Sequence, residues 1–71
     1  MANKIDFTKL KEIRLKKNFS QEAVAKDAGI NDASYSRIET GKTKGVSLQH
    51  MESFAKTFHL SLTDLITKLK E

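Results

Sequence analysis

Apolar residues recur along this chain at the spacing of helix faces, and turn-forming residues divide them into five runs. The first run predicts a helix that starts near Asp6, a suitable cap, and ends at about Lys17. Asn18 then stands where a residue with positive φ closes a helix, and Phe19 is expected to turn back toward the core. The apolar positions of this helix are Phe7, Leu10, Ile13 and Leu15.

The stretch Gln21–Thr40 has the pattern of two short helices joined by a tight turn. Ser20 is the expected cap of the first helix, and Gly29 supplies the positive φ that ends it. Ile30 is the apolar residue after the turn, and Asn31 is the expected cap of the second helix. The predicted apolar positions are Val24, Ala25 and Ala28, followed by Tyr35 and Ile38. A small residue at the crossing lets the two helices approach closely.

Two more helices are predicted after Gly41, which ends the previous helix and begins a basic loop. Their bounds are about 47–58 and 61–70, with Ser47 and Ser61 as caps, and Asp64 completes a capping pattern in the last helix. The apolar positions are Leu48, Met51, Phe54, Ala55, Phe58, Leu62, Leu65, Ile66 and Leu69. Proline is absent and clusters of β-branched residues are few. We therefore predict an all-α protein, with residues 1–71 in one compact domain of five helices.

The composition argues against several classes of site. The chain has no cysteine, which excludes disulfides and cysteine-based metal sites, and His50 and His59 lack a metal-ligand pattern. We expect no metal, no cofactor and no catalytic residue, because so short a helical chain leaves little room for an enzymatic cleft. No apolar run is long enough to span a membrane, and the start MANKIDF has no apolar signal core. We therefore expect a cytoplasmic location.

The formal net charge of +4 suits a polyanionic partner without identifying one. A more specific indication comes from spaced positions between about Leu10 and Leu65. They lie in the segments LKEIRLKKNFSQEAVAKDAGI, SRIETGKTKG and SLQHMESFAKTFHLSLTDL. In these segments the chain resembles the phage repressor and Cro type helix-turn-helix domains, also called the XRE family. The resemblance implies a lambda-repressor-like fold with the helix-turn-helix at 21–40, and transcriptional regulation by binding double-stranded operator DNA, usually as a homodimer.

The resemblance also assigns roles to particular residues of this chain. It implies that Gln21 contacts a DNA phosphate and braces the recognition helix, and that Arg14 and Glu39 pair beneath that helix. The base-reading positions would be Asp32, Ala33, Ser34 and Arg37. The remaining residues expected at the DNA are Asn31, Ser36, Thr40, Lys42, Thr43 and Lys44.

The recognition positions depart from the best-studied members of the family, which often carry Gln, Arg or Asn where this chain has Asp32, Ala33 and Ser34. A carboxylate near phosphates weakens binding unless it accepts a hydrogen bond from a cytosine amino group or a neighbouring arginine. Arg37 is able to donate to guanine, which is the commonest specific contact. The family also places an aliphatic residue at Tyr35, so we expect its ring in the core and its hydroxyl at the rim.

For the dimer contact, we expect the last helix and the end of the helix at 47–58, since Leu62, Ile66 and Leu69 exceed what so small a core needs. Three alternatives remain open. The chain can be an antitoxin that binds a toxin protein, a restriction-modification controller of the same fold, or a protein-interaction module that no longer binds DNA.

Overall fold

Four of the five α-helices begin at a side chain that caps them. In the computed structural model, which describes residues 4–43 and 45–71, Ser20, Asn31, Ser47 and Ser61 each accept a hydrogen bond from the backbone N–H three residues further on. The elements are the 3-10 turn η1 (Phe7–Lys9) and the helices α1 (Leu10–Lys16), α2 (Gln21–Ala28), α3 (Asp32–Glu39), α4 (Leu48–Thr57) and α5 (Leu62–Lys70). The predicted all-α fold is confirmed, because the described residues contain five helices and no strand.

The helix ends also follow from local sequence. Asn18, Gly29 and Gly41 have the positive φ values of 64°, 74° and 76° that the sequence predicted for them. His59, which follows the C-terminal cap of α4, has a φ of 59° and closes that helix in the same way. The sequence did not indicate this positive φ. The expected bounds agree with the structure to within one or two residues in α2 to α5, where Thr40 and Phe58 are the C-terminal caps of α3 and α4.

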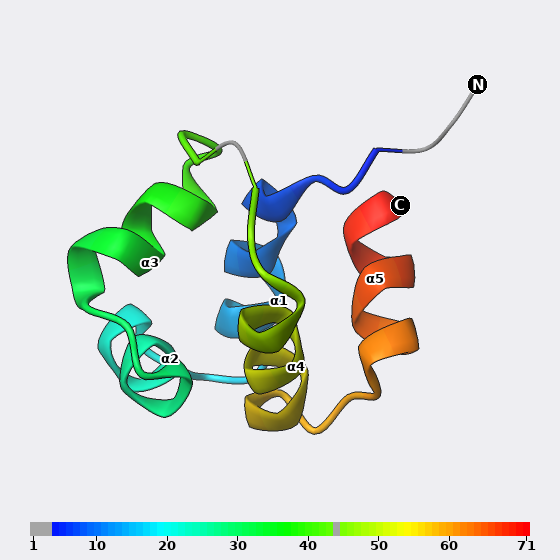
Figure 1. Ribbon diagram of the computed structural model, residues 1–71. Helices are drawn as coiled ribbons and strands as arrows, with labels where there is room; N and C mark the ends of the chain where they lie inside the picture. The colour runs from blue at the N-terminus through cyan, green and yellow to red at the C-terminus, as the bar shows by residue number, and fades with distance from the viewer. Residues whose placement is uncertain (1–3, 44) are drawn as a thin grey trace.

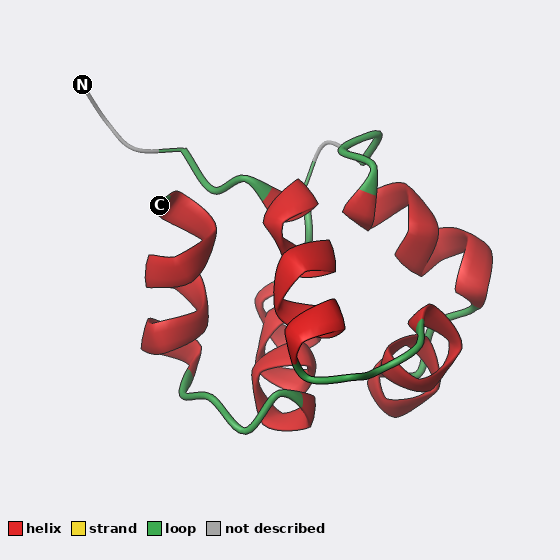
Figure 2. Cartoon of the chain, turned by 180° about the vertical axis from the view of Figure 1, so that it is seen from behind, coloured by secondary structure: helices red, strands yellow, loops and turns green. Residues whose placement is uncertain are grey.

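The helices surround one core. Figure 1 shows α2 and α3 on one side of the molecule, α1 and α4 in the middle and α5 on the other side. From behind, α1 lies in front, with α5 to one side of it and α3 to the other (Figure 2). α2 packs against both α3 and α4, and α4 packs against α5. The side chains with the least exposure in this core are Leu10, Val24, Ala25, Tyr35, Phe54, Phe58, Leu65 and Leu69.

The N-terminal helix is shorter than predicted. A helix over Asp6–Lys17 was expected, but the segment opens with η1, and α1 starts only at Leu10. The carboxylate of Asp6 accepts hydrogen bonds from both the backbone N–H and the hydroxyl of Thr8, which favours this tight turn. The backbone N–H of Asp6 donates to the carbonyl oxygen of Leu69 (2.9 Å) and so ties the start of the fold to α5.

Two leucines that were expected on the apolar faces of their helices are exposed. Leu15 is 55% exposed, because the buried positions of α1 are Leu10 and Arg14, and Leu15 follows on another side of the helix. Leu48 is 56% exposed, because it is the first residue of α4 and the core is reached only at Met51, one turn later. On α5, Leu65 and Leu69 are buried, whereas Leu62 and Ile66 are half-buried.

We expect Gly29→Ala to lower the free energy of unfolding by about 1 kcal/mol, since a residue with a Cβ pays about 1–2 kcal/mol for a left-handed backbone. A Cβ added at Gly29 meets no atom within 4 Å, so the cost is one of conformation alone. Gly45→Ala is the matched control, because that site is equally open and its φ lies outside the left-handed range. Urea unfolding followed by circular dichroism measures both. Equal effects of the two substitutions would contradict the expectation.

Candidate nucleic-acid interface

α3 has one buried side and one exposed side. Tyr35, Ile38 and Glu39 are buried, and Ser36 is half-buried. The four positions that the resemblance assigns to base reading all lie on the exposed side: Asp32, Ala33, Ser34 and Arg37. The structure therefore presents these side chains together to solvent.

A buried polar network lies under α3 and joins it to α1 and α2. Arg14 of α1 donates through Nε to Glu39 Oε2 (2.6 Å) and through Nη2 to Glu39 Oε1 (3.2 Å). Its Nη1 donates to the carbonyl oxygen of Phe19 in the α1–α2 loop (2.9 Å). Gln21, the first residue of α2, donates through Nε2 to Glu39 Oε1 (3.1 Å). Glu39 is thus held by two helices, which fixes the orientation of α3.

The carboxylate of Glu39 remains charged although it is buried. Burial acts to raise the pKa of Glu39, but hydrogen bonds, above all from Arg14, outweigh burial and bring its pKa below the ordinary carboxyl value. The pair is the only ion pair within residues 4–43 and 45–71. Arg14 is therefore the only cationic partner of Glu39 in the described part of the chain.

Tyr35 differs from the sequence prediction. Its ring is in the core and packs edge-on against Phe54, with 5.4 Å between ring centroids. Its hydroxyl, however, does not reach the rim. It is buried without a hydrogen-bond partner of regular geometry, the only such side-chain atom in the described part of the chain. Burial and the neighbouring carboxylate of Glu39 raise the pKa of Tyr35, so the hydroxyl stays protonated beside the network.

Two other predicted DNA-contact residues, Asn31 and Thr40, already use side-chain atoms in hydrogen bonds within the chain. Asn31 accepts the capping hydrogen bond from the Ser34 backbone through Oδ1 (2.7 Å), which leaves its amide NH₂ for a ligand. The hydroxyl of Thr40 donates to the carbonyl oxygens of Ser36 (3.0 Å) and Arg37 (3.2 Å). Because phosphate oxygens only accept, Thr40 must first give up these bonds in order to donate to a phosphate.

The loop after α3 starts beside the exposed face. The backbone N–H of Lys42 donates to the carbonyl oxygen of Arg37 (3.0 Å), which folds the chain back at Gly41. Lys42 is exposed and Thr43 is half-buried. Lys44, the third predicted contact in this loop, lies outside the described residues.

A shallow hollow beside α3 was not predicted. It has a volume of about 380 Å³, and its lining residues are Ile30, Ser34, Arg37, Ile38, Thr43, Gly45, Val46, Ser47 and His50. His50 is half-buried there and stacks on Phe54, with ring centroids 6.5 Å apart. The position of His50 three residues after the cap Ser47 indicates a first-turn helix residue, but nothing in the sequence pattern places it beside Arg37.

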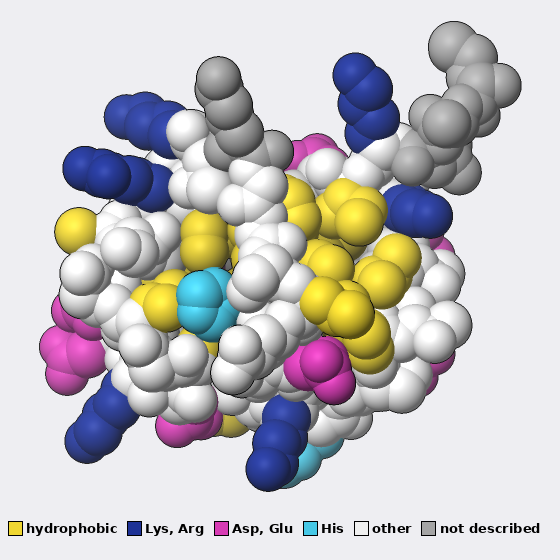
Figure 3. Space-filling model, in the orientation of Figure 1, with side chains coloured by type: hydrophobic (Ala, Val, Ile, Leu, Met, Phe, Trp, Pro, Cys, Tyr) yellow, Lys and Arg dark blue, Asp and Glu magenta, His cyan; other side chains and the backbone are white. Residues whose placement is uncertain are grey.

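The positive charge of the chain is not concentrated on the helix-turn-helix. Between residues 21 and 40, carboxylates outnumber cationic side chains: Glu22, Asp27, Asp32 and Glu39 against Lys26 and Arg37. Figure 3 shows Lys and Arg side chains projecting beside the end of α3, near the loop that follows it. Four other lysines belong to the helices α1 and α5: Lys11, Lys16, Lys68 and Lys70.

Within the described ranges, no group of His, Asp and Glu side chains is placed to hold a metal ion. The helices of that part of the chain are also too short or too polar for any of them to cross a membrane. His59 is exposed at the end of the segment after α4.

A comparison with known protein families shows which kind of helical domain this chain is. The model of the helix-turn-helix family HTH_3, which comprises the XRE domains of the Cro and C1 type, matches residues 10–65. The chain belongs to this family. HTH_3 is a family of DNA-binding regulatory domains and not of enzymes, so this XRE-type chain is a DNA-binding regulator. Comparison with the curated proteins gives no match.

For this HTH_3 domain, we expect Glu39→Gln to lower the free energy of unfolding at neutral pH by about 3 kcal/mol, since it leaves Arg14 buried without a counter-charge. The folded-state pKa of Glu39 is lowered, so its contribution is fully present above the ordinary carboxyl pKa. That contribution is lost as the pH falls through the lowered value. The difference between wild type and variant should therefore shrink below about pH 4.5.

Urea unfolding between neutral and acidic pH provides the measurement. Glu52→Gln, which removes an exposed carboxylate on α4, is the control and should follow the wild type at every pH. A gap between wild type and Glu39→Gln that stays constant down to the acid limit would show that the charge of Glu39 is not the cause.

Proposed function

We propose that this protein is a transcriptional repressor that binds a palindromic operator as a homodimer in the cytoplasm. The observation that carries the proposal is the combination of an exposed α3 face with a buried network at its base. Glu39 is bonded to Arg14 and to Gln21, so the side chains on the opposite side of α3 project from a fixed helix. Repression then follows when the bound dimer blocks the polymerase.

In this proposal α3 enters the major groove, the docking geometry known for phage repressors. Arg37 donates to O6 and N7 of a guanine, and Ala33 contacts a thymine methyl group. Ser34 bonds to a base edge or a phosphate. Asp32 accepts from a cytosine amino group, because a carboxylate in this position would otherwise repel the DNA.

Phosphate contacts come from the elements on either side of α3. The side-chain amide of Gln21 is held by Glu39 at the N-terminus of α2, where free backbone N–H groups and the helix dipole attract an anion. Lys42 and Thr43 contact the DNA backbone from the loop after α3. We add His50 to the candidates, since it lines the hollow beside Ser34 and Arg37.

The proposed dimer surface lies over α4 and α5. Figure 3 shows apolar side chains gathered over these helices on the face turned toward the viewer. Leu48 is 56% exposed, and Val46, Leu62 and Ile66 are half-buried. The surface involves the start of α4 and not its end, because Phe58 at the end of α4 is buried. Two copies joined here would read half-sites about 34 Å apart, one turn of the double helix.

Arg37→Ala should relax the base preference at one position of each half-site, with a loss of about 1–3 kcal/mol of discrimination per contact. Selection of bound sequences from a random duplex library, at two salt concentrations, measures the preference of both proteins. Lys56→Ala is the control, since it removes an exposed cation on α4. It should leave the selected sequence unchanged. An unaltered preference in Arg37→Ala would remove α3 from the proposed readout.

The dimer surface predicts a difference between the two exposed leucines. Leu48→Glu should shift the chain toward monomer, because it places a charge in an apolar contact. Leu15→Glu introduces the same change at 55% exposure on α1 and should have no effect on association. Sedimentation equilibrium with and without operator DNA distinguishes them. A wild type that stays monomeric at high micromolar concentration on its DNA would rule out the twofold arrangement.

A further inference from the structure

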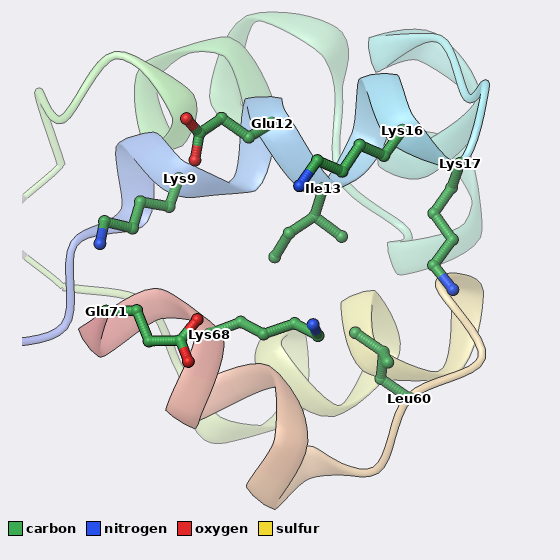
Figure 4. A pocket seen from close by; sticks show the side chains of 8 residues that line it. All are labelled: Lys9, Glu12, Ile13, Lys16, Lys17, Leu60, Lys68 and Glu71. Atoms are coloured by element: carbon green, nitrogen blue, oxygen red, sulfur yellow. The ribbon is translucent and has the colours of Figure 1, made fainter.

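A cleft opens between α1 and α5, on the side of α1 away from α3. Figure 4 looks into it, with α1 along one wall, α5 along the other, and α3 behind α1. Its volume is about 230 Å³, and its lining residues are Lys9, Glu12, Ile13, Lys16, Lys17, Leu60, Lys68 and Glu71. Ile13 and Leu60, both half-buried, point into it and form an apolar floor (Figure 4).

The walls of this cleft carry four lysines and two glutamates. None of the lysines forms an ion pair with a carboxylate of the described residues. The side chain of Lys16 runs along the α1 wall and ends beside Ile13, that of Lys68 extends into the cleft from the opposite wall, and that of Lys17 points toward Leu60 (Figure 4). The folded chain thus brings like charges together across an apolar floor.

This arrangement is not explained by helix stability alone. Lys16 and Lys17 lie at the C-terminal end of α1, where a cation complements the helix dipole. Lys68 lies in the last turn of α5 as well, but its side chain runs along the cleft toward Leu60 and away from Glu71 at the end of the helix (Figure 4). Its ammonium group therefore adds to the charge around the floor and does not complement its own helix end.

The chemistry of the cleft favours a peptide over a nucleic acid. A duplex bound along α3 lies on the far side of α1, and a rigid phosphate backbone does not fill an apolar floor. No aromatic side chain lines the cleft for bases to stack on. A volume of about 230 Å³ matches one large apolar side chain, with room for carboxylates to meet the surrounding lysines.

We propose that the α1–α5 cleft binds an acidic segment of a partner protein, with one large apolar side chain on Ile13 and Leu60 and neighbouring carboxylates on Lys16, Lys17 and Lys68. The cleft provides a docking site for a second protein while α3 remains free. This inference does not depend on the operator or on the dimer.

The test uses a fluorescein-labelled peptide in which Asp and Glu residues flank a single central Leu. Fluorescence anisotropy should show saturable binding to the wild-type chain. The double variant Lys16→Glu/Lys68→Glu should bind about tenfold more weakly or worse, because two attractive contacts become repulsive. The matched control is Lys26→Glu/Lys56→Glu, which makes the same change in net charge at exposed sites outside the cleft. It should lose much less affinity. Circular dichroism verifies that both variants are folded.

Each other outcome overturns the proposal. Equal losses in the two double variants would mean general attraction between opposite charges. Undiminished binding of a peptide with Ser in place of the central Leu would remove the apolar floor from the contact. If duplex DNA displaces the peptide, and Lys16→Glu/Lys68→Glu weakens DNA binding more than the control does, the lysines serve the DNA instead. Failure of the DNA experiments with Arg37→Ala would leave the peptide result unaffected.

Discussion

The position of α3 depends on the carboxylate of Glu39. Its two oxygens receive hydrogen bonds from Arg14 on α1 and Gln21 on α2, so that three helices meet at one charged group. A buried ion pair adds little net stability compared with well-packed apolar residues, because both ions must leave water. Its directional bonds nevertheless hold α3 in a defined orientation, as the proposed reading of bases by α3 requires.

Helix caps and a shared core stabilise the three helices that meet at Glu39. The helices are short, between seven and ten residues, and helices of this length are marginal in water on their own. They persist because four of them are capped and all of them bury residues in one core. Tyr35 connects the core with the polar network around Glu39, since its ring packs on Phe54 while its hydroxyl lies beside that network.

The sequence predicted the parts of the structure that local chemistry decides. Caps such as Ser20 and Asn31, and positive φ values at Asn18, Gly29 and Gly41, depend on one residue and its immediate neighbours. The exposure of Leu15 and Leu48 could not be predicted in this way, because helical spacing does not tell where a core ends. The same holds for the α1–α5 cleft, because Lys68 is distant in sequence from Lys9, Lys16 and Lys17. The candidate site residues were predicted from resemblance to a family. The hydrogen bonds that join Gln21 to Glu39 and Phe19 to Arg14 could be found only in the structure, because they depend on how the helices pack.

The backbone bond between Asp6 and Leu69 has a mechanical consequence. It joins the two ends of the described fold, so the path of the chain from η1 to α5 is nearly a closed ring. A force that pulls the ends apart would act first on this bond and on the packing of η1 against α5. A flexible tether attached after Glu71 would emerge at the end of α5, on the side of the fold opposite α3 (Figure 1), so that a fused domain and α3 would have little opportunity to hinder each other.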